Sequence, residues 1–278
     1  MTDFFKVSGG GNDFLALAEP AEAPATEDIR AWCGRGVSLG ADGLFVLRRA
    51  GPRVEMDYFN SDGLPADLCL NGTRCAAQLA FHLGWADNTV EIQTGAGPVP
   101  AHRIDERNVR VELPAPGTPR QMTVEAAGTA VTGGFVTVGV PHFVLLWPEL
   151  ERAPLAGLAP PLRRHAAFGP AGTNVNFARF PERHRMEIRS YERGVEGETL
   201  ACGTGVLAGA AAGLALGQAE LPLQVLTRGG FILAVEETPQ GDRWSLAGDA
   251  RVVARGELFA GASLAPAAPD WDPAREDG

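Results

Sequence analysis

Short apolar segments with polar residues at alternate positions recur along the whole chain. In the first part they lie at residues 14–17, 44–47, 54–59, 90–93 and 109–113. In the second part they lie at residues 134–140, 143–147, 175–180, 186–191, 223–227, 231–236, 244–246 and 251–259. A period of two is typical of strands with one buried face. The pattern therefore predicts a chain rich in strands and poor in helices.

Two segments break this pattern with long runs of small and apolar residues, and both are predicted to be helices. They are CLNGTRCAAQLAFHLG at residues 69–84 and CGTGVLAGAAAGLALG at residues 202–217. Aligned on the first cysteine, both have glycine at +3, alanine at +8, leucine at +14 and glycine at +15. A closing glycine is typical of a helix C-terminus. Two similar halves, each with a buried helix inside a curved sheet, predict an internally duplicated α+β fold.

A proline-rich stretch at residues 113–119 separates the two series of strands and has the composition of an interdomain linker. We expect a first domain at residues 1–115, which a strand near residues 257–265 completes. We expect a second domain at residues 116–256. Residues 266–278 contain three prolines and four acidic residues, and they are expected to form a disordered tail.

Composition and charge exclude several classes of protein. The 278 residues are 45% hydrophobic, enough to bury a core, and the net charge of -10 with no basic run argues against a nucleic-acid or anionic-membrane binder. The longest small and apolar run, residues 206–216, is too short to cross a bilayer, and the N-terminus lacks the pattern of a signal peptide. No cysteine–histidine cluster has zinc-ligand spacing, so no metal is expected. We expect a soluble cytoplasmic protein.

Two of the four cysteines stand in a repeated context, because Cys69 and Cys202 each open a predicted helix. The free N–H groups of a helix start favour a thiolate and bind carboxylates. If the halves bring both starts face to face, one sulfur can remove a proton from a carbon and the other can return one. This arrangement suits inversion beside a carboxylate without a pyridoxal cofactor. Cys33 and Cys75 lack this context and are interpreted as small buried residues.

Structural interpretations compete with these chemical ones. A single cysteine is most often a small buried hydrophobe, and only the repeated context favours function. Glu192 and Arg193 could hold an ammonium and a carboxylate, or could form a solvated strand end. Asn12, Asn60 and Asn174 flank glycine-rich or turn segments, where asparagine commonly serves the turn itself.

At these residues the chain closely resembles the diaminopimelate epimerase family, and the resemblance runs through nearly its whole length. The matching motifs are KVSGGGNDF at 6–14, FNSDG at 59–63, CLNGTRC at 69–75, GTNVNF at 172–177, ERG at 192–194 and ACGTG at 201–205. The resemblance implies two pseudo-symmetric domains, each a curled mixed or antiparallel sheet wrapped around a central helix. It also implies a homodimer, with a small amino acid as substrate.

The resemblance further implies that Cys69 and Cys202 are the two catalytic groups in the epimerisation of LL- to meso-diaminopimelate. This reaction serves lysine and peptidoglycan precursor synthesis and needs no cofactor. In the family pattern Glu192 binds the ammonium of the reacting centre. The carboxylate and the distal end of the substrate have their own groups: Leu70 (through its backbone N–H), Asn71, Gly203 and Thr204 for the first, and Asn12, Asn60, Asn174 and Arg193 for the second.

The chain departs from the family pattern at Leu70 (usually glycine), Val140 (usually asparagine) and Ser8 (usually histidine). The first two departures motivate an alternative, a racemase or epimerase of another amino acid of the histidine or hydroxyproline type. The distal polar residues favour diaminopimelate. Two further alternatives are an isomerase with a carboxylate base and a non-catalytic binding protein, and the cysteine pair argues against both. His142 could assist a cysteine, orient the substrate, or be structural.

Overall fold

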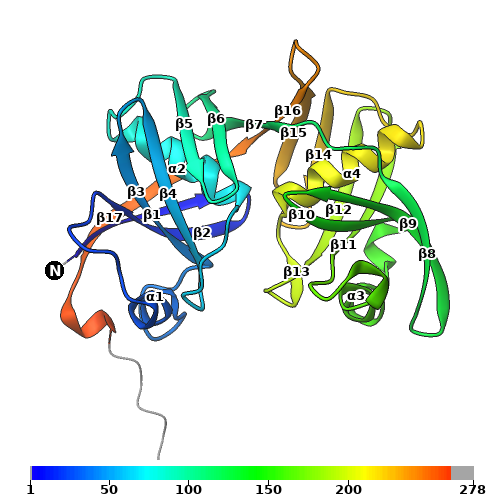
Figure 1. The fold of residues 1–278 in the computed structure, drawn as a ribbon, viewed down its shortest axis with the longest axis horizontal. Coiled ribbons are helices and arrows are strands. Elements are labelled where there is room, and N and C mark those ends of the chain that lie inside the picture. The colour runs from blue at the N-terminus through cyan, green and yellow to red at the C-terminus, as the bar shows by residue number, and fades with distance from the viewer. Residues whose placement is uncertain (1, 264–278) are drawn as a thin grey trace, which may run out of the picture.

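The computed structural model describes residues 2–263 and shows two lobes of similar construction (Figure 1). The first half contains β1 (Thr2–Gly9), β2 (Asn12–Ala18), α1 (Thr26–Cys33), β3 (Gly43–Ala50), β4 (Arg53–Asn60), α2 (Leu70–His82), β5 (Thr89–Thr94), β6 (Gly97–Arg103) and β7 (Asn108–Pro114). The second half contains β8 (Arg120–Ala126), β9 (Thr129–Val138), β10 (Val140–Leu146), η1 (Leu150–Arg152), α3 (Leu155–Arg163), η2 (Ala166–Phe168), β11 (Asn174–Glu182), β12 (Arg185–Glu192), β13 (Gly197–Thr199), α4 (Gly203–Ala215), β14 (Leu223–Thr227), β15 (Ile232–Glu237) and β16 (Arg243–Asp249). The described chain ends with β17 (Arg251–Leu258) and η3 (Ala260–Ser263).

The two halves repeat one strand topology. In the first, neighbours run from β1 through β7 in sequence order, with parallel pairs at β2–β3 and β4–β5 and antiparallel pairs elsewhere. In the second, the order is β9, β10, β11, β12, β14, β15 and β16, and the parallel pairs are β10–β11 and β12–β14. The parallel pairs therefore fall at equivalent places, and the internal duplication expected from the sequence is confirmed.

Each half wraps its sheet around one buried helix. In the first half, α2 packs against β1, β5, β6, β7 and β17, and in the second, α4 packs against β9, β10, β11 and β12. The small residues of α4 permit this close packing: a Cβ atom added at Gly213 would lie 2.4 Å from the Phe180 ring. Both helices end at the predicted glycines, Gly84 and Gly217, which adopt the left-handed conformation with φ of 70° and 66°. The predicted fold class is thus confirmed.

Two pairings join the halves (Figure 1). Strand β7 pairs antiparallel with β16, so the hydrogen-bonded sheet continues from one half to the other. Strand β17 returns to the first half and pairs antiparallel with β1. It begins at Arg251, before the range 257–265 in which the returning strand was expected. The domain limits at residues 115 and 256 stay a prediction, and the tail at 266–278 lies outside the described residues.

Several elements were not predicted from the pattern. Strand β1 lacks alternation because both of its faces are buried: Phe4 packs in the cluster beside α1, and Phe5 packs in the cluster around α2. Helix α1 begins after Ala25, which makes no side-chain capping hydrogen bond, so its N-cap gives no start signal, although Glu27 and Asp28 make the first turn acidic. Strand β6 contains Pro98 and Pro100, and proline is unusual inside a sheet because it cannot donate a backbone hydrogen bond. Both prolines lie opposite β5 in a part of β6 that has no partner residue in β7.

Candidate active site

The two predicted cysteines occupy equivalent positions as the N-cap residues of α2 and α4. Cys69 has φ and ψ of -135° and 103°, and Cys202 has -115° and 108°, so both are extended. The first helical hydrogen bonds run from Thr73 N–H to the Cys69 carbonyl at 2.7 Å and from Val206 N–H to the Cys202 carbonyl at 2.9 Å. The N–H groups between them have no acceptor within the helix and can bind an anion beside each sulfur.

The helix starts meet at Leu70 and Gly203, the first residues of α2 and α4. A Cβ atom added at Gly203 would lie 2.8 Å from Leu70 Cβ, so the backbone of one helix touches the side chain of the other. Leu70 is 3% exposed and lies in helical conformation, which keeps its N–H directed out of the helix end. The departure from glycine at this position therefore fills the contact between the helices and leaves the backbone donor in place.

The thiols themselves differ from the expectation in one respect. Burial raises the pKa of Cys69, and the facing Gly72 N–H offsets this only in part. Burial raises the pKa of Cys202 further, with the Glu192 carboxylate adding to the effect. The helix N–H groups thus act in the expected direction, but the expectation of lowered pKa values is wrong, because removal of a thiolate from water outweighs these groups.

Glu192 ends β12 beside the second helix start. Its carboxylate accepts a hydrogen bond from Thr199 Oγ1. Burial raises its pKa, and the hydrogen bonds from Thr199 and Cys202 oppose that rise. Thr204 Oγ1 lies 3.5 Å from Cys202 Sγ. The second cysteine thus has a carboxylate and a hydroxyl as immediate neighbours.

The side chains of Asn12 and Asn71 are bonded to each other and to the protein. Asn71 Nδ2 donates to Asn12 Oδ1 at 2.7 Å and to the Ala201 carbonyl at 3.1 Å. Asn12 Nδ2 in turn donates to Asp42 Oδ2 at 2.9 Å. This network connects the first half to Ala201, the residue before Cys202. The Asn71 side chain is therefore occupied, and its backbone N–H is the group that can hold a carboxylate.

The remaining predicted residues lie at or next to the ends of strands. Asn174 begins β11 and its Oδ1 accepts from Arg193 N–H at 2.8 Å. Within residues 2–263 the Arg193 side chain forms no ion pair. Asn60 ends β4 and is exposed. Arg193 and Asn60 thus retain polar groups that a ligand can use.

His142 belongs to a buried polar network that the sequence did not reveal. Asn176 Nδ2 lies 3.0 Å from His142 Nδ1, and Ser190 Oγ donates to Asn176 Oδ1 at 2.8 Å. Because an amide nitrogen only donates, His142 accepts at Nδ1 and carries its proton at Nε2. Burial, and then the charge of Arg193, lower the pKa of His142 to about 3. The imidazole is therefore neutral, and its buried Nε2–H has no acceptor among the described residues.

Sequence reasoning missed four side chains near the cysteines: Tyr58, Arg74, Asn176 and Ser190. Asn176 and Ser190 stand in apolar strands, and a polar residue in a buried strand was the available signal. Tyr58 packs edge-to-face on Phe14 with ring centroids 6.0 Å apart. The first half thus has an aromatic cluster behind its helix start, where the second half has a hydrogen-bonded polar network.

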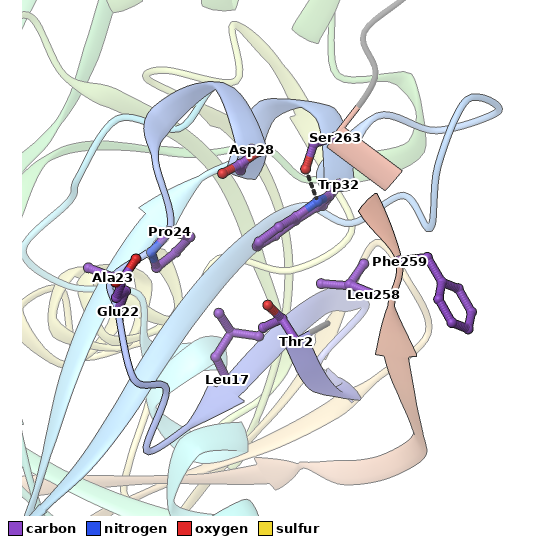
Figure 2. A pocket seen from close by; sticks show the side chains of 10 residues that line it. All are labelled: Thr2, Leu17, Glu22, Ala23, Pro24, Asp28, Trp32, Leu258, Phe259 and Ser263. Carbon is purple, nitrogen blue, oxygen red and sulfur yellow. Dashed lines mark hydrogen bonds between the residues drawn. The ribbon is translucent and has the colours of Figure 1, made fainter. Parts of the chain in front are cut away.

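Hollows on the outside of the first half lie apart from these groups. One of about 320 Å³ lies between α1, β2 and the end of β17, and Trp32 Nε1 donates to Ser263 Oγ at 3.1 Å on its wall (Figure 2). Another of about 460 Å³ is lined by Phe5, His82, Leu83 and residues 252–255. None of the predicted site residues lines either one.

Residues 2–263 hold no group of three or more potential metal ligands, and no helix among them is long and apolar enough to cross a membrane.

Known proteins are similar to this chain over most of its length. A sequence model described as "Diaminopimelate epimerase" matches residues 4–117 and 134–253. The diaminopimelate epimerase of Aquifex aeolicus is 36% identical over 271 residues, which cover 92% of this chain and 97% of that protein. The diaminopimelate epimerase of Gemmatimonas aurantiaca is 36% identical over 282 residues, with 92% and 98% covered.

Solved structures share the fold at much lower identity. A putative phenazine biosynthesis PhzC/PhzF protein from Clostridium difficile has a TM-score of 0.71 and 14% identity, with 93% of this chain and 100% of that chain covered. A probable proline racemase from Agrobacterium radiobacter, with bound carbonate, has a TM-score of 0.67 and 14% identity, with 94% and 93% covered. These likenesses concern the fold alone.

The low pKa of His142 makes stability depend on pH. The unfolded chain binds a proton at this side chain below about pH 6.5, whereas the folded chain does so only near pH 3. Stability is therefore lost as the pH falls through this window, by about 2 kcal/mol between pH 7 and pH 5 from this group. Urea unfolding at both pH values measures the loss. The His142→Asn variant, which keeps an acceptor for Asn176, should lose less, and an unchanged loss would contradict the assignment.

Proposed function

The chain belongs to the diaminopimelate epimerase family and is an isomerase, and from this premise we propose that it converts LL-2,6-diaminopimelate to the meso isomer with Cys69 and Cys202 as acid and base. The observation that carries this proposal is the pair of equivalent N-cap cysteines on two helices whose first residues touch. Each sulfur has free helix N–H groups beside it. A substrate between the helix starts has a sulfur on either side of its α-carbon.

In the proposed reaction the thiolate of one cysteine takes the α-proton. The C–H bond breaks, an S–H bond forms, and negative charge develops on the α-carbon and the adjacent carboxylate. The N–H groups of Leu70, Asn71, Gly203 and Thr204 point out of the two helix starts and stabilise that charge. The thiol of the other cysteine then gives its proton to the opposite face of the carbon. One proton leaves the substrate and one enters, so the net charge of the pair is unchanged.

The ends of the substrate are held by groups of opposite charge. The Glu192 carboxylate, next to Cys202, is proposed to bind the ammonium of the reacting centre. The free-energy cost of removing that ammonium from water is offset by its attraction to the buried carboxylate. Arg193 has no carboxylate partner within the described residues, and with Asn60 and Asn174 it is proposed to bind the distal amino-acid end. Asn12, whose side chain is hydrogen-bonded to Asn71 and Asp42, is proposed to join them at that end.

Leu70 and Val140 favour one other function, a racemase of a smaller amino acid. Val140 begins β10, where the family pattern has a polar residue, and a valine offers no hydrogen bond to a distal group. Leu70, however, packs against Gly203 and so fills the space between the helices. Because the Leu70 side chain is used in that packing, it gives no reason to expect a substrate pocket too narrow for diaminopimelate. Diaminopimelate therefore stays the proposed substrate.

Proton NMR in D2O tests this function directly. With reduced protein, the α-proton signal of LL-diaminopimelate should decrease as solvent deuterium enters and the meso isomer forms. Histidine, proline and hydroxyproline, incubated in parallel, should keep their α-protons. Exchange in one of these amino acids and none in diaminopimelate would instead support the racemase. If no tested amino acid exchanges its α-proton, both the epimerase and the racemase function are contradicted.

Replacement of either proposed catalytic cysteine by alanine should lower epimerisation by about 10²–10⁴-fold, because one proton transfer loses its group. The measurement is the initial rate of meso isomer formation by Cys69→Ala and Cys202→Ala. Cys33→Ala is the matched control: Cys33 is also a buried free thiol, but it ends α1. Its rate should stay near that of the unchanged protein. A cysteine whose removal leaves the rate intact is not part of the reaction.

We also propose that the protein is a cytoplasmic homodimer that serves the synthesis of lysine and peptidoglycan precursors. The family resemblance supports the dimer, and the exposed apolar Val253 and Phe259 at β17 offer surface for it. The four free cysteines suit a reducing compartment, which cell fractionation can check. Light scattering should give about twice the chain mass of 29.2 kDa. A mass of one chain across the micromolar range would contradict the dimer.

A further inference from the structure

Arg74 is a buried cation behind the first helix start. It lies on α2, five residues after Cys69, and is 0% exposed. Side chains on a helix lean toward its N-terminus, and the guanidinium accordingly reaches back to donate from Nη2 to Asn71 Oδ1 at 2.6 Å. Its Nε donates to the Asp249 carbonyl at 3.4 Å. The cation therefore lies over the helix turn whose N–H groups face the site.

No anion pairs directly with this cation. Among residues 2–263 no carboxylate lies within 4.0 Å of the guanidinium, and Nη1 has no hydrogen-bond partner. The carboxylate of Asp249 is paired with Arg251 at 2.8 Å. A cation near a helix N-terminus also opposes the helix dipole, so helix stability does not explain it. A buried cation of this kind requires a compensating negative charge nearby.

The second half has the opposite charge at its helix start. The position in α4 equivalent to Arg74, counted from the cysteine, is Leu207, which is buried and apolar. Conversely, β12 ends with the carboxylate of Glu192, where the equivalent strand β4 ends with the neutral Asn60. The backbone is pseudo-symmetric, but one cysteine has a cation behind it and the other has an anion beside it.

We propose that the two thiols are electrostatically unequal, and that the opposite charges at the two helix starts, Arg74 behind Cys69 and Glu192 beside Cys202, make Cys69 ionise first. Within the proposed function this assigns the resting base to Cys69 and the resting acid to Cys202. Arg74 acts through the charge of Cys69 and does not touch the reacting carbon, so it is a positioning residue. The assignment concerns thiol ionisation, which is measured without substrate.

The groups that face each sulfur agree with this order. Burial raises the pKa of both thiols. At Cys69 the Gly72 N–H lowers the pKa most and the Glu192 carboxylate raises it, and the Tyr58 hydroxyl and the Arg74 guanidinium lower it further by smaller amounts. At Cys202 the neighbouring Glu192 carboxylate raises the pKa, and only the neutral Thr204 hydroxyl and Gly205 N–H lower it. Of these two thiols only Cys69 has a cation among its neighbours, and the same cation also lowers the pKa of the buried Cys75.

Alkylation of the reduced protein by iodoacetamide from about pH 7 to about pH 11 measures the order, because burial raises both thiol pKa values above the usual range. Fragment-ion mass spectrometry separates Cys69, Cys75 and Cys202, and the pH of half-maximal rate reports ionisation independently of access. We expect the half-maximal pH of Cys69 to lie at least about one unit below that of Cys202, which is a tenfold larger thiolate fraction. Equal values, or a lower value for Cys202, would overturn the proposal.

Two charge variants then test the cause. In Arg74→Met, which keeps the length of the side chain, the Cys69 curve should move to higher pH and its rate at pH 8 should fall about tenfold. Arg74→Lys should keep most of the acidity, and Leu207→Met, the matched substitution in α4, should move neither curve. If Arg74→Met folds and the Cys69 curve stays in place, Arg74 is structural and the proposal is wrong.

A variant at Glu192 covers the case in which Arg74→Met does not fold. Glu192→Gln should move the Cys202 curve to lower pH by more than it moves the Cys69 curve. An equal movement of both curves would show that Glu192 does not distinguish the thiols, and would contradict the charge arrangement. Because no substrate is present, these results are separate from the NMR test: unequal thiols without exchange would leave this inference standing and the proposed function overturned.

Discussion

The close meeting of two helix N-termini is the constraint on which the rest of the structure depends. The backbone of α4 can approach the Leu70 side chain of α2 this closely only because Gly203 has no side chain of its own. A Cβ atom at Gly203 would contact Leu70 at 2.8 Å, and one at Gly205 would contact Asn176 Oδ1 at 2.5 Å. The sheets must curl around the helices to hold them in this arrangement. The duplicated topology achieves this, and β7–β16 and β17–β1 join the two halves.

The sequence predicted the parts of the fold in which one local pattern acts alone. Both central helices were predicted, because small apolar runs between a cysteine and a closing glycine carry their own start and stop signals. Strand β1 was missed, because Phe4 and Phe5 are buried on opposite faces and the expected alternation is absent. Helix α1 was missed because its N-cap, Ala25, gives no capping signal. In each of these cases tertiary packing supplied what the local sequence does not show.

The site was predictable to the same degree. The repeated cysteine context led to Cys69 and Cys202, which occupy equivalent helix starts as expected. The buried network of His142, Asn176 and Ser190 was not predictable, because its members come from three strands whose alignment depends on the whole sheet. The sign of the thiol pKa shifts was also missed. Helix N–H groups can be inferred from sequence, whereas the depth of burial that outweighs them cannot.

Pseudo-symmetry of the backbone does not require symmetry of charge. An enzyme that interconverts two stereoisomers must catalyse both directions in the ratio that the equilibrium sets, whatever the resting state of its acid and base. Unequal thiols therefore leave the equilibrium between the isomers unchanged. They decide only for which isomer the resting enzyme already has its thiolate and its thiol on the correct sides of the α-carbon. After each conversion the proton is on the other cysteine, and one proton must be exchanged before the same isomer can react again. A cation behind Cys69 and an anion beside Cys202 favour that return, because both charges restore the thiolate to Cys69.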